Sequence, residues 1–305
     1  MNSEIIIVLG TAAAHSHSYD SSLMERLLFK VAKKWVAGYD ADNAIRVALD
    51  SNSRGRLAIV NFLGEEVVDA SVVEKTVAEY LLLMQLMHKR NVRGCISAKP
   101  TQLGLAISYD LCLQNFKKLA SRAKELGQFL WIDMESTKVT EDTIAIYLQV
   151  RDQYNMTGVA IQSYLRRSAS DLLHIIEQGG IVRLVKGAYH EPEEHAFTSK
   201  EEIDANYRKL MKMLFESKNY FAIGTHDSKM IEEALRLSSS DGNSKFEFQL
   251  LMGIRDELKA SLVEKGFVVA EYIPYGSQWL PYSVRRIRER RRNLLLLARS
   301  LIQQQ

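Results

Sequence analysis

Short apolar runs that recur at nearly even spacing constrain the fold of this chain more than any other feature. Each run is followed by a polar turn and an amphipathic stretch, a pattern typical of alternating strands and helices. The eight runs begin near Leu57, Val92, Phe129, Gly158, Ile181, Phe221, Phe246 and Phe267. They lie about 30 residues apart on average, which is the length of one strand–helix–strand unit.

The stretches between the runs have the periodicity of helices with one apolar face. We predict helices over residues 67–89, 111–126, 141–154, 170–177, 201–216, 229–237, 255–265 and 281–302. Eight strand–helix units over residues 55–305 match the size of a (β/α)₈ TIM-like barrel, an α/β fold. An open doubly wound sheet is the alternative, but the first run is not followed by the glycine-rich fingerprint of a dinucleotide-binding fold.

The residues before the first strand form a separate helical segment. Leu27, Val31 and Trp35 are among the apolar residues at helical spacing within residues 21–49, and Gly38 interrupts this stretch. We therefore predict an N-terminal helical arm, residues 1–54, and a catalytic barrel domain, residues 55–305.

The composition excludes several classes of protein. The 305 residues are 47% hydrophobic and 25% charged, which suits a large globular core, and the net charge of +3 is too small for a dedicated nucleic-acid binder. Cys95 and Cys112 have no metal-ligand spacing, and we predict neither a disulfide nor a metal site. The apolar run after Glu4 lacks the features of a signal peptide, so we expect a cytoplasmic protein whose membrane contacts are peripheral, at the inner face.

Polar side chains gather at the ends of the predicted strands. In a barrel these ends meet at one mouth, where TIM-barrel active sites lie. The residues that we expect to share this mouth are Lys99, Asp133, Glu135, Gln162, Tyr164, Arg183, Lys186, Tyr189, Thr225, His226, Asp227, Glu247, Gln249, Glu271 and Tyr272. Arg183, inside an apolar strand, would be a costly buried charge unless an anionic or electron-rich group meets it.

The last predicted helix carries a candidate anion site. Tyr282, Arg285, Arg286 and Glu289 have the spacing of one helix face. Two guanidinium groups near a helix N-terminus suit a carboxylate, because they bind its oxygens in two-point geometry.

Four segments together resemble the proline dehydrogenase family in its monofunctional bacterial form. They are the residues RLVKGAY from Arg183, GTHD from Gly224, FEFQLL from Phe246 and YSVRRIRE from Tyr282. The resemblance implies a distorted (β/α)₈ barrel that binds FAD noncovalently and oxidises L-proline to Δ1-pyrroline-5-carboxylate by hydride transfer to flavin N5. It also implies a membrane quinone as electron acceptor and, since no second catalytic domain fits in the chain, a separate Δ1-pyrroline-5-carboxylate dehydrogenase.

The resemblance also assigns roles to individual residues. It implies that Arg285 and Arg286, assisted by Lys99, bind the proline carboxylate, that Tyr272 and Tyr282 border the ring, and that Glu289 orients an arginine. Asp133 and Arg183 are implied as catalytic residues, Asp133 through electrostatic support and Arg183 beside flavin N5. The implied cofactor-binding residues are Met134, Gln162, Arg183, Lys186, Gly187, Ala188, Thr225, His226 and Gln249.

Two other functions fit the same residues. Lys99 or Lys186 could form a Schiff base, which would make the chain an aldolase-type lyase. The third possible function is that of a noncatalytic barrel that binds an anion at Arg285 and Arg286, since a fold alone does not guarantee activity.

Overall fold

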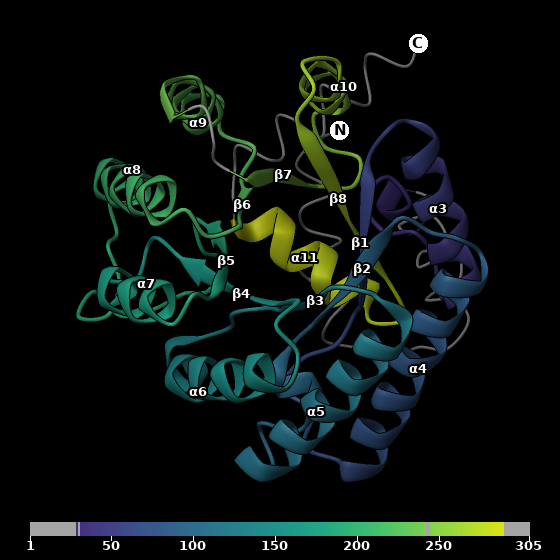
Figure 1. Cartoon of the computed structure of the whole chain (residues 1–305). Coiled ribbons are helices and arrows are strands. Elements are labelled where there is room, and N and C mark those ends of the chain that lie inside the picture. Colours follow the sequence, from purple (N-terminus) through teal and green to yellow (C-terminus); the bar gives the residue numbers. More distant parts are fainter. Residues whose placement is uncertain (1–28, 30, 242–244, 290–305) are drawn as a thin grey trace, which may run out of the picture.

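Eight parallel strands close into a barrel, as the spacing of the apolar runs predicts (Figure 1). The structure, a computed structural model, describes residues 29, 31–241 and 245–289. Strand order follows the chain, and β8 pairs with β1 from Leu57 opposite Ala270 to Phe62 opposite Tyr275. The strands are β1 (Leu57–Phe62), β2 (Gly94–Ala98), β3 (Leu130–Ile132), β4 (Thr157–Gln162), β5 (Ile181–Val185), β6 (Phe221–Gly224), β7 (Phe246–Leu251) and β8 (Val268–Tyr275).

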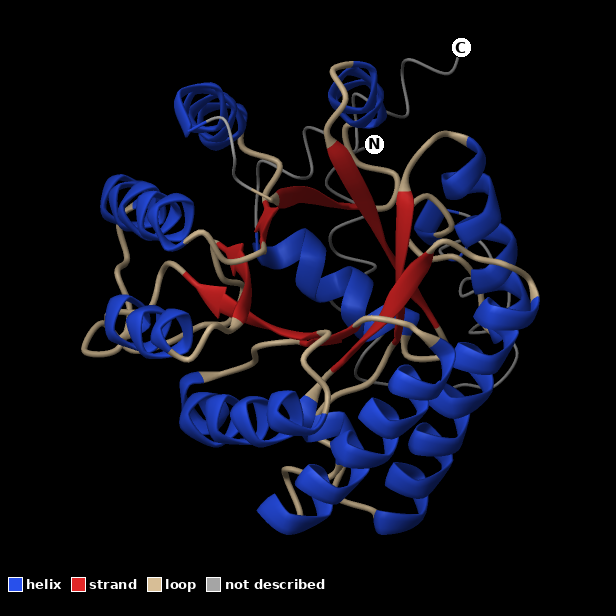
Figure 2. Ribbon diagram, viewed as in Figure 1, coloured by secondary structure: helices blue, strands red, loops and turns tan. Residues whose placement is uncertain are grey.

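Helices surround the barrel on its outer side (Figure 2). They are α3 (Ala41–Ser53), α4 (Ala70–Lys89), α5 (Tyr109–Leu126), α6 (Thr137–Gln153), α7 (Ser168–Glu177), α8 (Lys200–Ser217), α9 (Ser228–Asp241) and α10 (Asp256–Glu264). A short 3₁₀ helix, η1 (Pro100–Leu103), follows β2 and is absent from the sequence-based expectation. Among the described helices none is both long and apolar enough to cross a bilayer.

The alternation of side chains along each strand divides the core in two. Outward residues such as Val60, Ile96 and Ile132 pack against the helices in the main core. Inward residues such as Ile59 and Trp131 form a smaller cluster inside the barrel. The sequence therefore builds two apolar layers, one on each side of the sheet.

Local capping fixes where several helices begin and end. The Asp69 carboxylate accepts a hydrogen bond from the Ser71 amide at the start of α4, and Ser108 does the same for Leu111 at the start of α5. Gly127 ends α5 in the left-handed conformation, with φ of 64°. Such caps explain why most observed boundaries lie within a few residues of the predicted ones.

The helix before the barrel packs on it directly. α3 contacts β1 and β8, and its buried residues Ala44, Ile45 and Ala48 belong to the main core. The predicted break at Gly38 is confirmed, because α3 begins three residues later. Residues 1–28 of the predicted arm lie outside the described part of the chain.

The last described helix does not join the outer ring. α11 (Trp279–Glu289) crosses the end of the barrel in Figures 1 and 2. It packs on the segment before α3, where the Trp35 indole donates a hydrogen bond to Ser283 Oγ at 3.0 Å. Phe29, Trp35, Trp279 and Tyr282 share one buried cluster there. The predicted helix over 281–302 thus begins at Trp279, and its part beyond Glu289 lies outside the described residues.

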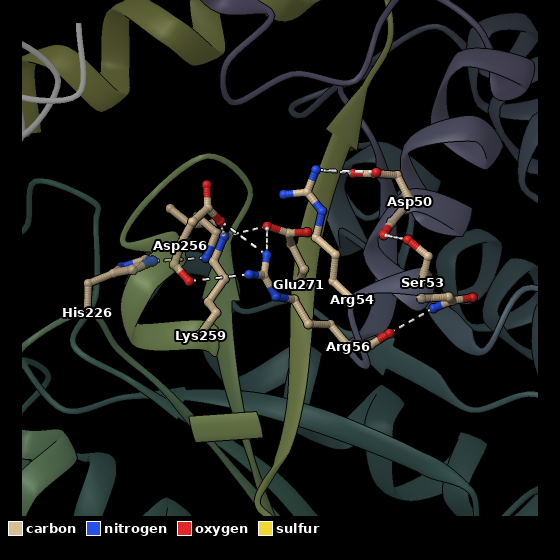
Figure 3. A network of polar contacts seen from close by, with 10 residues as sticks. Asp50, Ser53, Arg54, Arg56, His226, Asp256, Lys259 and Glu271 are labelled. Carbon is tan, nitrogen blue, oxygen red and sulfur yellow. Dashed lines mark hydrogen bonds and ion pairs between the residues drawn. The ribbon is translucent and has the colours of Figure 1, made fainter. Parts of the chain in front are cut away.

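A charge network, buried except at Asp256, joins the start of β1 to β8 and α10 (Figure 3). Lys259, which is fully buried, contacts both Glu271 and Asp256. Arg56 contacts the same two carboxylates at 3.6 and 3.1 Å. Two cations thus neutralise two anions on the outside of the barrel.

Candidate functional site

A polar cavity opens at the carboxyl ends of the strands, beneath α11. We call it the mouth. It is lined by Asn61, Lys99, Asp133, Met134, Ala160, Gln162, Arg183, Val185, Lys186, Gly187, Ala188, Tyr189, Gly224, Thr225, His226, Gln249, Leu250, Leu251, Tyr272 and Tyr282. Every strand except β2 and β3 supplies lining residues from its own length, whereas Lys99, Asp133 and Met134 come from the loops just after those two.

Asp133 is the centre of a buried hydrogen-bond cluster in the mouth. Its Oδ1 accepts from Arg183 Nη1 at 2.5 Å and from Ser97 Oγ at 2.7 Å, while its Oδ2 accepts from Tyr272 OH at 2.7 Å. Burial, followed by the Asp133 charge, holds the pKa of Tyr272 well above its ordinary value. The tyrosine is therefore a neutral donor, and the carboxylate faces three donors at once.

Arg183 lies between two aromatic rings. Its guanidinium carbon is 4.5 Å from the centroid of Trp131 and 5.6 Å from that of Tyr272. Pairing with Asp133 and stacking on these rings offset the cost of burying its charge. Within the described part of the chain, Arg183 Nε and Nη2 and Gln249 Oε1 have no hydrogen-bond partner.

Lys186 is held by carboxylates at the side of the mouth. Its Nζ contacts Asp204, and it lies 2.6 Å from Asp227 Oδ2. Burial favours a raised pKa for Asp227, but the hydrogen bond and charge of Lys186 outweigh it and hold the pKa at about 2. Lys200 contacts Asp204 as well, so two lysines and two carboxylates form one group.

Lys99 connects three loops above the strands. Its Nζ lies 3.1 Å from Glu65 Oε2, and Tyr189 OH is 3.4 Å from the same oxygen. Glu65 follows β1, Lys99 follows β2 and Tyr189 follows β5. Glu65 therefore links the loops after β1, β2 and β5 through these two contacts at the edge of the mouth.

His226 is fixed by the backbone of the neighbouring strand. The amide of Leu251 donates to His226 Nε2 at 2.9 Å, which assigns the proton of a neutral ring to Nδ1. Arg255 donates to the His226 carbonyl at 2.7 Å. The imidazole is thus oriented by β7.

Gly187 brings the chain close to another loop. Its φ is 110°, and a Cβ atom there would lie 2.1 Å from the ring of Tyr164. Only glycine fits this combination of conformation and space. The loop after β5 can therefore place Lys186 and Ala188 along the wall of the mouth.

Most of the residues predicted for the site line the mouth. They are Lys99, Asp133, Met134, Gln162, Arg183, Lys186, Gly187, Ala188, Thr225, His226, Gln249, Tyr272 and Tyr282. Arg285, Arg286 and Glu289 belong to α11, which passes over the mouth, but their side chains lie outside the described part of the structure.

Five residues expected to share the mouth do not line it: Glu135, Tyr164, Asp227, Glu247 and Glu271. Tyr164 lies beside Gly187, and Asp227 contacts Lys186 at the side of the mouth. Glu247 lines a different cavity at the opposite end of the barrel, and Glu271 faces outward to Lys259. Glu135 lies behind the mouth, where it accepts hydrogen bonds from the Thr101 amide and hydroxyl at 2.8 and 2.6 Å. These residues were expected in the mouth because they lie in or just after the strands, without regard to the face that each one occupies or to its depth along the strand.

Sequence reasoning also missed residues that belong to the site. Ser97 lies two positions before Lys99 in the sequence. Because successive side chains of a strand point to opposite faces, the alternation along β2 could have predicted that Ser97 points into the barrel. Asn61 has the corresponding position in β1 and lines the mouth. Glu65 and Asp204 lie in segments without a periodic signal that would mark them as partners of the site lysines.

The mouth suits a flavin on the chemistry of its side chains. Arg183 and Gln249, which line the mouth, each keep buried polar atoms that have no hydrogen-bond partner among the described residues, and Lys99, Arg183 and Lys186 bring positive charge to its wall. A flavin ring carries both acceptors and a donor along its edge, and positive charge nearby favours its reduced form. The residues present therefore fit this group.

Comparison with known proteins gives a consistent result. A sequence model of the family described as "Proline dehydrogenase" matches residues 44–298. The chain is 34% identical over 278 residues to proline dehydrogenase 2 of Bacillus subtilis strain 168, covering 88% of this chain and 92% of the relative. It is 30% identical over 287 residues to the proline dehydrogenase of Deinococcus radiodurans, covering 92% and 93% of the two chains.

A solved structure shares the barrel. Proline utilization A from Bdellovibrio bacteriovorus, in a form inactivated by N-propargylglycine, superposes with a TM-score of 0.85 at 21% identity. The match covers 94% of this chain and 36% of that much longer one. The family match and the two relatives carry the assignment, and this superposition supports the fold. The chain belongs to the proline dehydrogenase family, whose enzymes oxidise proline.

Proposed function

We propose that the chain oxidises L-proline to Δ1-pyrroline-5-carboxylate with a noncovalently bound FAD in the mouth. The observation that carries this proposal is the cluster of Asp133, Arg183 and Tyr272, all three of which line the mouth beneath α11. When bound, FAD would supply the oxidant, accepting a hydride at N5 from the ring carbon next to the proline nitrogen.

The residues that would hold the cofactor come from the strand ends. Met134, Gln162, Lys186, Gly187, Ala188, Thr225, His226 and Gln249, together with Arg183, line the mouth and fit this role. Arg183 would direct its unpaired Nε and Nη2 donors toward the cofactor, since Nη1 is already committed to Asp133. Lys186 would contribute positive charge, reduced by its two carboxylate partners.

The residues that would hold proline come from α11 and the loops. Arg285 and Arg286 would bind the carboxylate with help from Lys99, and Glu289 would orient one of the arginines. Tyr272 and Tyr282 would border the pyrrolidine ring. Asp133 would fix Tyr272 and Arg183 in place, so that positioning is the main catalytic device.

The proposed partners follow from this chemistry. A membrane quinone would accept the electrons, which would bring the protein to the inner face of the membrane as a peripheral contact. A separate Δ1-pyrroline-5-carboxylate dehydrogenase would consume the product.

The ion pairs of the two site lysines argue against a Schiff-base lyase. Lys99 is paired with Glu65, and Lys186 with Asp204 and Asp227, so each amine would have to leave its carboxylate partners before it could attack a carbonyl group.

The test is the visible spectrum of the purified protein before and after anaerobic addition of L-proline. A yellow protein whose flavin band bleaches with proline is the expected result. A flavin that stays oxidised would contradict proline as the reductant. A colourless protein that does not bind added FAD, but is trapped covalently by borohydride with a carbonyl substrate, would favour the lyase.

A further inference from the structure

A second cavity lies at the opposite end of the barrel from the mouth. Its volume is about 430 Å³, within the ~300–1,000 Å³ typical of small-molecule sites. We call it the lower cavity; its wall includes Leu57, Phe129, Trp131, Met156, Tyr220 and Glu247. These residues belong to the amino ends of the strands or directly precede them, except Trp131 and Glu247, which lie second in β3 and β7.

Small residues inside the barrel explain why this space is not filled. TIM barrels are normally packed by layers of large branched side chains. Here Cys95, Ala222 and Ala270 occupy inward positions of the interior cluster. Gly158 leaves room for the Trp131 indole, because a Cβ atom there would lie 2.4 Å from the ring. The lower cavity is thus a consequence of the sequence of four strands.

Trp131 and Arg183 separate the lower cavity from the mouth. Trp131 lines the lower cavity, Arg183 lines the mouth, and the guanidinium stacks on the indole at 4.5 Å. A ligand in the lower cavity would therefore touch neither the proposed cofactor site nor the proposed proline site.

The walls of the lower cavity are mostly apolar and aromatic. Leu57, Ile59, Ile181 and Met156 supply aliphatic surface, and Met156, 43% exposed, lies at the outer edge. Burial raises the pKa of the Cys95 thiol, so this group adds an uncharged surface and no nucleophile. Such walls favour an apolar ligand body that displaces poorly held water.

Among the described residues, Glu247 is the one carboxyl group on this wall, and it has hydrogen-bond donors but no ion-pair partner. It is 5% exposed, accepts from Gln249 Nε2 at 2.5 Å and from the Tyr220 hydroxyl, and has no ion pair among the residues that the structure describes. Arg183 attracts it from farther away, but Nη1 of that residue is bonded to Asp133 and Ser97. A carboxylate accepts about four hydrogen bonds, so further acceptor capacity remains.

We propose that the lower cavity binds a small aromatic amine, with its ring against Phe129 and Trp131 and its ammonium group on Glu247. Burial raises the pKa of Glu247 above its ordinary value, although the hydrogen bonds from Gln249 and Tyr220 oppose this shift. An ammonium group placed on the carboxylate would supply a counter-charge and so favour its ionised form. An ammonium group also gains from nearby aromatic faces. A ligand with only an acceptor would instead require Glu247 to give up one of these contacts or to carry a proton.

Calorimetric titration with benzylamine tests this proposal, with benzyl alcohol as the neutral analogue of similar shape. We expect one site per chain and at least tenfold weaker binding of the alcohol, a difference of roughly 1.4 kcal/mol. Glu247→Gln should weaken benzylamine by a similar factor. Glu264→Gln, an exposed acid on α10, is the matched control and should leave the affinity unchanged.

A second variant keeps the proposal testable if Glu247→Gln folds poorly. Leu57→Trp should fill the outer part of the lower cavity and abolish benzylamine binding while retaining the circular dichroism spectrum. Equal affinities for amine and alcohol would overturn the proposal. Unchanged benzylamine binding in both variants would also overturn it. So would a loss of benzylamine affinity on anaerobic addition of L-proline, because competition with proline would place the amine in the mouth.

Discussion

Arg183 Nη1 and Asp133 Oδ1 lie 2.5 Å apart inside the barrel, although 50 residues separate them in the chain. β5 carries the arginine, and the loop after β3 carries the aspartate. Each group is too polar to be buried alone, and each places the opposite charge beside the other. The Asp133–Arg183 pair therefore supports both the proposed chemistry and the packing of the strands that hold it.

Replacing Asp133 with asparagine should leave Arg183 as a poorly compensated buried charge. We expect about 3 kcal/mol of lost unfolding free energy and a fall in proline turnover of about 100-fold. Urea denaturation and steady-state kinetics measure the two effects. Asp152→Asn, at a side chain that is 78% exposed, is the control; comparable losses in both variants would contradict a specific role for the pair.

Tyr272→Phe should remove the hydroxyl that donates to Asp133 Oδ2 and keep the aromatic wall of the mouth. We expect a loss of about tenfold in kcat/KM and a fall of a few degrees in melting temperature, because one hydrogen bond to a charged group contributes about 1.5–3 kcal/mol to stability. Wild-type kinetics in this variant would show that the hydroxyl does not position the reacting groups.

Arg286→Met tests the carboxylate role proposed for α11. The concentration of proline needed for half-maximal rate should rise by at least tenfold, with a smaller effect on kcat. An Arg286→Lys variant should recover only part of the loss, because an ammonium group cannot reproduce the two-point geometry of a guanidinium. Unchanged proline dependence in the methionine variant would refute the assignment.

Lys259→Met tests the network of Figure 3 as a structural feature. Glu271 would lose the contact from a fully buried cation, and we expect about 3–5 kcal/mol of destabilisation. The double variant Lys259→Met with Glu271→Leu should be more stable than the single one. Lys118→Met, on the exposed face of α5, should leave the midpoint of urea denaturation unchanged.

The Asp227–Lys186 pair predicts a specific acid dependence of stability. The folded pKa of Asp227 is about 2, below the unfolded value of about 4. Its contribution is therefore complete above pH 4 and is lost as the pH falls from 4 to 2. Solvent screens a pair at the edge of the mouth, so Asp227→Asn should remove only about 1 kcal/mol of this pH dependence. If the unfolding free energy of Asp227→Asn depends on pH between 4 and 2 as that of the wild type does, the pair makes no such contribution.

The barrel could be predicted from sequence because burial on both faces of parallel strands leaves a strong repeating apolar signal. The position of α11 could not, since an amphipathic helix packs equally well on the outside of a sheet or across its end. What decides its place is the contact of Trp279 and Tyr282 with Phe29 and Trp35, which is a property of the folded chain.

The errors at the site have equally specific causes. Glu271 and Tyr272 are adjacent, so they face opposite sides of β8, and only the tyrosine points inward. Glu247 and Gln249 share one face but stand about 7 Å apart along β7, enough to place one at each end of the barrel. A position near a strand end therefore identifies a residue of the mouth only in combination with two other facts. These are the face of the strand that the residue occupies and its distance along the strand.

The Trp35–Ser283 hydrogen bond has a consequence for how the protein opens. A ligand that reaches the mouth past α11 needs a local separation of a few aromatic side chains, whereas the strands beneath can remain paired. The free energy of that opening is a separate quantity from the free energy of global unfolding. Amide hydrogen exchange should therefore be faster in α11 than in the strands, and substrate access could evolve through the small cluster around Trp35 without altering the stability of the barrel.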